Sequence, residues 1–192
     1  MTTNNNCSCN SSNNEYFKDN KLDILKFINE KRMVDVFIKI VKVETTSIPD
    51  SKSFPSSEGQ KILAQILVEE LKNIGVEDVM VDEHHVVTAT LPDNMGNIIN
   101  KPTIGLLAHM DTSDSVPGDN VNPLIHKNYQ GGDINLKDNT TILAKQLHPF
   151  IGQDIITSDG TTLLGADNKA GIAEILEALM VYKENHELIH PK

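Results

Sequence analysis

Apolar residues recur at helical spacing near both ends of the chain. Between Leu22 and Val43 they predict two short helices, or one helix interrupted at Asn29-Glu30-Lys31. Near the other end, the stretch from Gly171 to Tyr182 has the same periodicity. Each of these helices is expected to bury one face.

The clearest helix is predicted between these two regions. Apolar residues from Ile62 to Leu71 follow a period of 3.6 residues. Ser57 and Gln60 fit a capping box at the start, and Gly75 suits the left-handed position that closes a helix. We therefore expect a helix from Ser57 to about Ile74.

A period of two, typical of strands, replaces the helical spacing after Gly75. Val76 to Leu91 is predicted to form a hairpin that turns at His84-His85. Thr103 to Ala108 is a short apolar run, as in a strand buried on both faces of a parallel sheet, and Asp154 to Thr157 is a further strand. The polar segment from Ser113 to Gln153 is long enough to be functional or a subregion of its own. Together the elements predict an α/β fold with helices on both faces of a mixed, mostly parallel sheet.

Composition and charge narrow the possible partners. The chain has 192 residues and a formal net charge of −10, which opposes binding to nucleic acid and to anionic membranes. It has no apolar run of membrane-spanning length and no basic, apolar leader, so we expect a cytoplasmic protein. Residues 1–20, rich in Asn and Ser, are predicted to be a disordered tail, and residues 21–192 an α/β domain. Cys7 and Cys9 lie in the tail, where we expect reduced thiols.

The first chemically informative segment follows the apolar strand. His109 lies just beyond the end of Thr103 to Ala108, where open α/β sheets place ligands. Asp111, two residues on, projects to the same side of an extended chain and can orient the imidazole for metal binding. An isolated His-x-Asp also fits a capped core histidine beside a turn aspartate.

A second segment adds a carboxylate at the start of a helix. Asp167 lies between Gly165 and Gly171, which permit close approach of the backbone. A carboxylate there can bridge two divalent cations, whereas a helix cap would need only one of its oxygens and neither glycine. Lys169 lacks the spacing of a nucleotide-binding loop.

These segments carry a resemblance to a known enzyme family. The ordered motifs LLAHMDTSD, NVNPLI, YQGGDI and TTLLGADNKAGIAEILEAL resemble the N-terminal part of the peptidase T family of tripeptide aminopeptidases. That family is similar to carboxypeptidase G and acetylornithine deacetylase, within a larger group of zinc exopeptidases. The resemblance covers about residues 31–182 and implies a zinc-exopeptidase-like catalytic domain acting on small peptides, chiefly tripeptides.

The resemblance also implies roles for individual residues. His109 would bind one zinc ion, Asp167 would bridge two, and Asp111 would be the acidic residue that supports His109 in catalysis. A non-proline cis peptide bond is implied between Asp167 and Asn168, although Asn168 stands where the peptidase T pattern commonly has Asp. The family's downstream Glu-Glu pair and its other ligands are absent before Lys192, so the chain is expected to be a truncated portion without activity.

Two rival interpretations remain open at this stage. One is a non-catalytic remnant that binds metal weakly or acts through protein contacts. The other is a deacetylase or carboxypeptidase of the same family, which would share His109 and Asp167 as metal residues.

Overall fold

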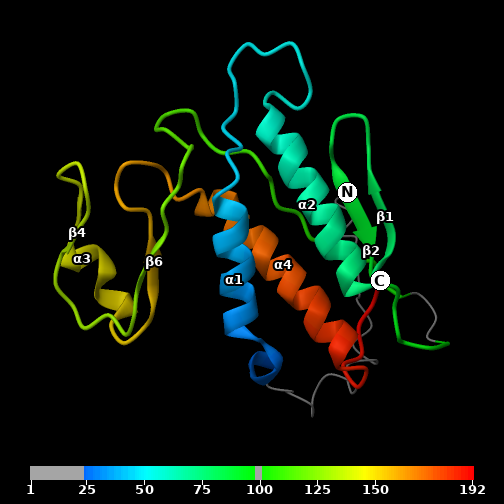
Figure 1. The fold of residues 1–192 in the computed structure, drawn as a ribbon. Coiled ribbons are helices and arrows are strands. Elements are labelled where there is room, and N and C mark those ends of the chain that lie inside the picture. Colours follow the sequence, from blue (N-terminus) through cyan, green and yellow to red (C-terminus); the bar gives the residue numbers. More distant parts are fainter. Residues whose placement is uncertain (1–23, 98–100) are drawn as a thin grey trace, which may run out of the picture.

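The computed structural model describes residues 24–97 and 101–192 (Figure 1). The predicted tail and both cysteines lie outside these ranges. The helices are η2 (Ile24–Phe27), α1 (Glu30–Val41), α2 (Glu58–Ile74), α3 (Ala144–Leu147), η3 (His148–Phe150) and α4 (Ala166–Glu184). The strands are β1 (Glu77–Val81), β2 (Val87–Thr90), β3 (Leu124–His126), β4 (Ile134–Asn135), β5 (Thr141–Ile142) and β6 (Ile155–Thr157). None of the helices in the described ranges is long and apolar enough to cross a membrane.

The predicted helices form close to their expected bounds. The N-terminal helical region is interrupted as predicted, because Asn29 caps α1 by accepting a hydrogen bond from the Arg32 amide. Helix α2 ends where expected, with Gly75 in the left-handed region at φ 77°. The predicted capping box at Ser57 is wrong, since the Ser57 side chain makes no cap bond. Gln60 instead donates to the Thr45 carbonyl and the Ser56 hydroxyl, which draws its side chain away from the helix start.

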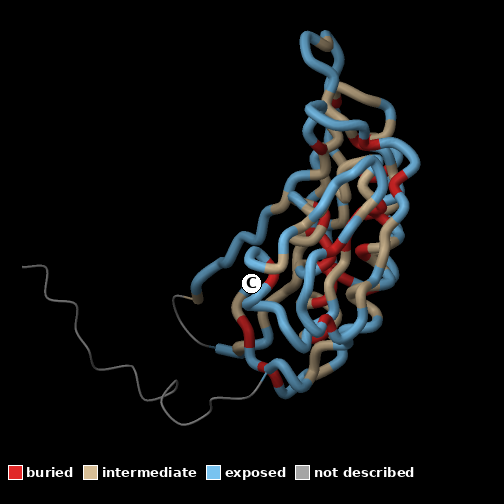
Figure 2. Tube along the Cα trace, turned by 90° about the vertical axis from the view of Figure 1, so that its left-hand side faces the viewer, coloured by how far each residue is buried: buried red, intermediate tan, exposed pale blue. Residues whose placement is uncertain are grey.

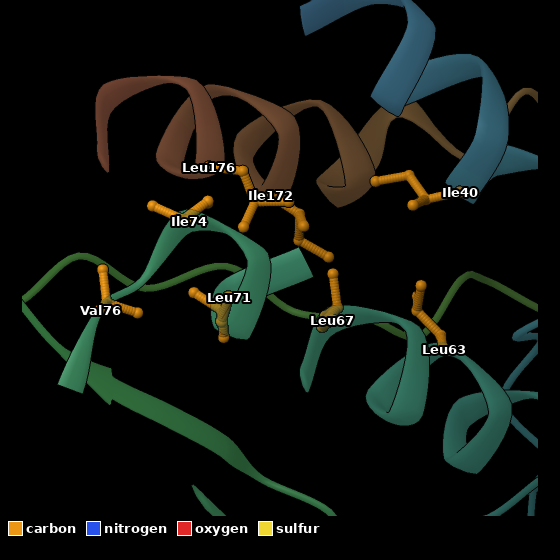
Figure 3. Close-up of a cluster of buried hydrophobic side chains, with 8 residues drawn as sticks. All are labelled: Ile40, Leu63, Leu67, Leu71, Ile74, Val76, Ile172 and Leu176. Atoms are coloured by element: carbon orange, nitrogen blue, oxygen red, sulfur yellow. The ribbon is translucent and has the colours of Figure 1, made fainter. Parts of the chain in front are cut away.

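Three helices enclose the main core. Helix α4 packs against both α1 and α2, and apolar side chains from all three meet in Figure 3. This cluster consists of Ile40, Leu63, Leu67, Leu71, Ile74, Val76, Ile172 and Leu176. Figure 2 shows that buried positions concentrate in the body of the molecule, while the outer loops are exposed.

The strands of the described residues pair only as antiparallel couples. The predicted hairpin is confirmed as β1 paired with β2, and His85 takes a positive φ of 63° in its turn. The other couples are β3 with β6 and β4 with β5. Helix and strand content therefore fits an α/β class.

The structure does not show the mostly parallel sheet that the sequence predicts. Thr103 to Ala108 does not form a strand, since it pairs with no strand of the described residues, and Leu107 is 88% exposed. The one parallel contact in the described ranges is an isolated bridge between Thr46 and Thr112.

The long polar segment folds into a small unit of its own. Strands β3 to β6, with α3 and η3, lie to the side of α1, away from the hairpin (Figure 1). Tyr129, Ile134 and Leu147 form its core. Asp159 follows β6, where the chain leaves this unit. Hydrogen bonds from the Thr161 hydroxyl and from Lys137 hold the pKa of the Asp159 carboxyl well below 3.8.

Candidate metal centre

The structure brings together the three site residues predicted from the sequence. The His109 Nε2 atom lies 3.0 Å from Oδ1 of Asp167, across 58 residues of chain. On its other side, His109 Nδ1 lies 3.1 Å from Oδ1 of Asp111 and 3.0 Å from the Asp111 carbonyl oxygen. The imidazole thus stands between two carboxylates.

The partners of His109 determine how its two ring nitrogens are used. Both atoms that face Nδ1 are acceptors, so Nδ1 must donate. Burial lowers the pKa of His109, but the hydrogen bonds to Asp167 and Asp111 outweigh it and raise this pKa above 6.5. Oδ1 of Asp167 is an acceptor as well, so the protonated imidazole also donates from Nε2, and loss of that proton would free the Nε2 lone pair for an ion.

The exposure of the His109 and Asp167 side chains argues against a purely structural role for these residues. The His109 side chain is 51% exposed and that of Asp167 is 95% exposed, so His109 is not a capped core histidine and the Asp167 carboxylate is open to an ion. Both groups lie at the surface rather than in the core, where an ion could reach them.

The start of α4 explains how Asp167 comes to face His109. Gly165 has a left-handed backbone (φ 77°), the predicted cis peptide bond between Asp167 and Asn168 is present, and both of the latter residues have non-helical dihedral angles. Asn168, not Asp167, caps the helix, because its Oδ1 accepts a hydrogen bond from the Gly171 amide. A Cβ on Gly171 would lie 2.3 Å from that oxygen, which explains the glycine. The Asp167 carboxylate is thereby left for another partner.

Two residues around the site were not predicted from the sequence. Ser47 donates its hydroxyl to Oδ2 of Asp111 at 2.7 Å, although it lies 64 residues away in the chain. Lys169 is only 1% exposed, donates to the Val43 carbonyl at 2.7 Å, and has its pKa lowered to about 8 by burial. Neither role leaves a local signal, because both depend on where the segment after α1 is placed.

The donor set fits part of a zinc site. Two ligands of one tetrahedral zinc, each about 2.0 to 2.2 Å from the metal, lie about 3.3 to 3.6 Å apart, so the two groups, now 3.0 Å apart, would need to separate by only a few tenths of an ångström. Within residues 24–97 and 101–192, no three His, Cys, Asp or Glu side chains are grouped to hold one ion. Of the described residues, His109 and Asp167 would thus offer an ion one imidazole and one carboxylate.

Known proteins resemble this chain in sequence and in structure. It is 47% identical over 168 residues to peptidase T of Bacillus pumilus, and 48% identical over 165 residues to peptidase T of Alkaliphilus oremlandii. These matches cover 85% and 83% of this chain. The chain is a homologue of peptidase T. It spans only 40% of the length of these two curated peptidase T relatives.

A solved structure agrees with the sequence relation to peptidase T. A tripeptidase from Staphylococcus aureus superposes with a TM-score of 0.54 and 30% identity, over 86% of this chain and 35% of that enzyme. No protein-family model matches the chain.

Proposed function

We propose that this chain supplies part of the active site of a zinc-dependent tripeptide aminopeptidase. The observation that carries the proposal is the linked set Asp111, His109 and Asp167, with Nε2 of the imidazole directed at the Asp167 carboxylate. The names of the homologues, peptidase T and a tripeptidase, supply the reaction class and support a peptide substrate. A cytoplasmic location, without nucleic acid or membrane as partner, fits the net charge of −10.

Each residue of the set has a defined task in this proposal. Asp111 holds the Nδ1 proton and so keeps Nε2 as the ligand atom of His109. The exposed Asp167 carboxylate has two oxygens, enough to bridge a pair of zinc ions. Bound zinc would polarise the peptide carbonyl and lower the pKa of a water molecule.

The ligand count means that the site needs further residues. A catalytic zinc normally takes three protein ligands and a water, and His109 and Asp167 supply two groups for a proposed pair of ions. We place the remaining ligands and the general base in the part of the relatives that this chain does not span. In the same larger fold, Thr103 to Ala108 would become a strand of a mostly parallel sheet, which would cover its exposed apolar side chains.

A chimera tests the proposal. The part of this chain that aligns with the Bacillus pumilus enzyme, at 47% identity, would replace the corresponding segment of that enzyme. We expect the chimera to release the N-terminal residue of tripeptides, and His109→Ala or Asp167→Ala to abolish this activity. Asp111→Asn should reduce it by about 10- to 100-fold with little change in melting temperature.

The outcomes separate the rival functions. A folded chimera that hydrolyses no peptide would overturn the proposal and favour a non-catalytic remnant. Turnover of N-acyl amino acids in preference to tripeptides would assign the site to a deacetylase instead.

A further inference from the structure

The segment that follows α1 lies directly against the candidate metal centre. The Ser47 amide donates to the Thr112 carbonyl at 2.9 Å, and the Thr112 amide donates to the Thr45 carbonyl at 3.1 Å. These two bonds form the parallel bridge between Thr46 and Thr112. The backbone of Ser47 is therefore fixed beside the residue that follows Asp111.

Close packing holds this segment from two further directions. A Cβ on Gly59, in the first turn of α2, would lie 1.5 Å from the Glu44 carbonyl oxygen, so the helix start rests directly on the segment. A Cβ on Gly118 would lie 2.5 Å from the Thr46 hydroxyl, so the loop after Thr112 also closes over it. With the backbone clamped in this way, the Cβ of Ser47 is held in place, and the hydrogen bond to Asp111 selects the rotamer of its hydroxyl.

The Ser47 hydroxyl completes a chain of hydrogen bonds that ends at the candidate metal ligand. It donates to Oδ2 of Asp111 at 2.7 Å, while Oδ1 of the same carboxylate accepts from Nδ1 of His109. With one oxygen held by each neighbour, the Asp111 carboxylate cannot rotate without breaking a bond. Its plane, and with it the direction of the imidazole ring, is thereby fixed.

We propose that Ser47 is a positioning residue of the metal centre, acting through Asp111 to orient His109 Nε2. This inference rests on the proposed function, in which His109 binds zinc. Removal of the hydroxyl would leave the Asp111 carboxylate free to turn, while Nδ1 would keep the Asp111 carbonyl as its acceptor. The expected loss is therefore near the lower end of the range for partners that orient metal ligands, about 10-fold in zinc affinity.

The test is a zinc titration of residues 1–192, followed by NMR through the ring nitrogen and carbon signals of His109. NMR detects weak binding, so a site with few ligands is within its reach. We expect zinc to shift the Nε2 signal, Ser47→Ala to weaken this binding by about 10-fold, and Ser47→Thr to restore it. Ser51→Ala is the matched control, because the Ser51 hydroxyl faces Ser53 rather than the site, and should leave binding unchanged.

A double-mutant cycle separates positioning from general destabilisation. Because Ser47 acts through Asp111, adding Ser47→Ala to Asp111→Asn should cause no further loss of zinc affinity. Additive losses, or a Ser47→Ala chain with wild-type affinity, would overturn the role of Ser47 while zinc binding at His109 stands. If zinc leaves the His109 signals of the wild-type chain unchanged, the proposed function itself fails. Should Ser47→Ala not fold, Ser47→Cys, which supplies a weaker donor, takes its place with the same expected direction.

Discussion

Glu177 joins α4 to α1 through a buried, bidentate ion pair. Its carboxylate accepts from Nε and Nη2 of Arg32 at 2.7 and 2.9 Å, and from the Asn29 amide at 2.7 Å. The Glu177 side chain is 4% exposed, and its hydrogen bonds raise the pKa of the Arg32 guanidinium above its ordinary value. Loss of one partner of a fully buried pair costs about 3 to 5 kcal/mol, because the other charge is left uncompensated.

Two features reduce the cost expected for Glu177→Gln. The Arg32 side chain is 24% exposed, and it keeps a second partner in Glu184 at 2.7 Å. We therefore expect the free energy of unfolding to fall by about 2 to 3 kcal/mol. Glutamine keeps the size of the side chain, so no cavity contributes to this value.

Urea unfolding monitored by circular dichroism measures the effect. Glu184→Gln is the matched control, because Glu184 binds the same arginine from the same helix but is 49% exposed. The Glu184→Gln variant should lose less than about 1 kcal/mol in its free energy of unfolding. Equal losses for the two variants, or a loss below about 1 kcal/mol for Glu177→Gln, would refute the reasoning from burial.

Three further predictions concern acid stability, activity and packing. Since the folded-state pKa of Asp159 lies below 3.8, its stabilising effect is present above that value and is lost as the pH falls through the folded-state pKa. The urea midpoint of the wild type should therefore drop more between about pH 5 and pH 3 than that of Asp159→Asn, and equal slopes would contradict this. Residues 1–192 alone should hydrolyse no tripeptide even with added zinc, as measured by amino acid release; turnover that His109→Ala removes would show that the two ligands suffice. Gly59→Ala should cost at least about 3 kcal/mol, because its Cβ would overlap the backbone of Glu44, whereas Gly105→Ala, with no atom closer than 3.8 Å to its Cβ, should change the melting temperature little.

Local sequence signals were sufficient for the helices and the hairpin. Helix α2 is defined by its own periodicity and by Gly75, and the hairpin by alternation about His85, so both appear where predicted. Local signals could not decide whether Thr103 to Ala108 forms a strand. A strand needs a neighbour, and its apolar composition says nothing about whether one lies beside it in the described residues.

Some features of the candidate site follow from local sequence patterns or the resemblance, whereas others depend on contacts between distant segments. The pairing of His109 with Asp111 follows from a spacing of two residues, and the approach of Asp167 follows from the resemblance. The contribution of Ser47 depends on backbone bonds between segments 64 residues apart, which no local pattern records. The capping role of Asn168 was hidden for a different reason, because both Asp and Asn suit a helix cap.

The most direct test of the metal centre is the location of zinc in crystals of residues 1–192 soaked with zinc. Anomalous scattering at the zinc absorption edge identifies the ion without assumptions about its ligands. The account predicts a peak about 2.0 to 2.2 Å from both His109 Nε2 and an Asp167 carboxylate oxygen. A peak elsewhere on the molecule, with none between these two side chains, would contradict it.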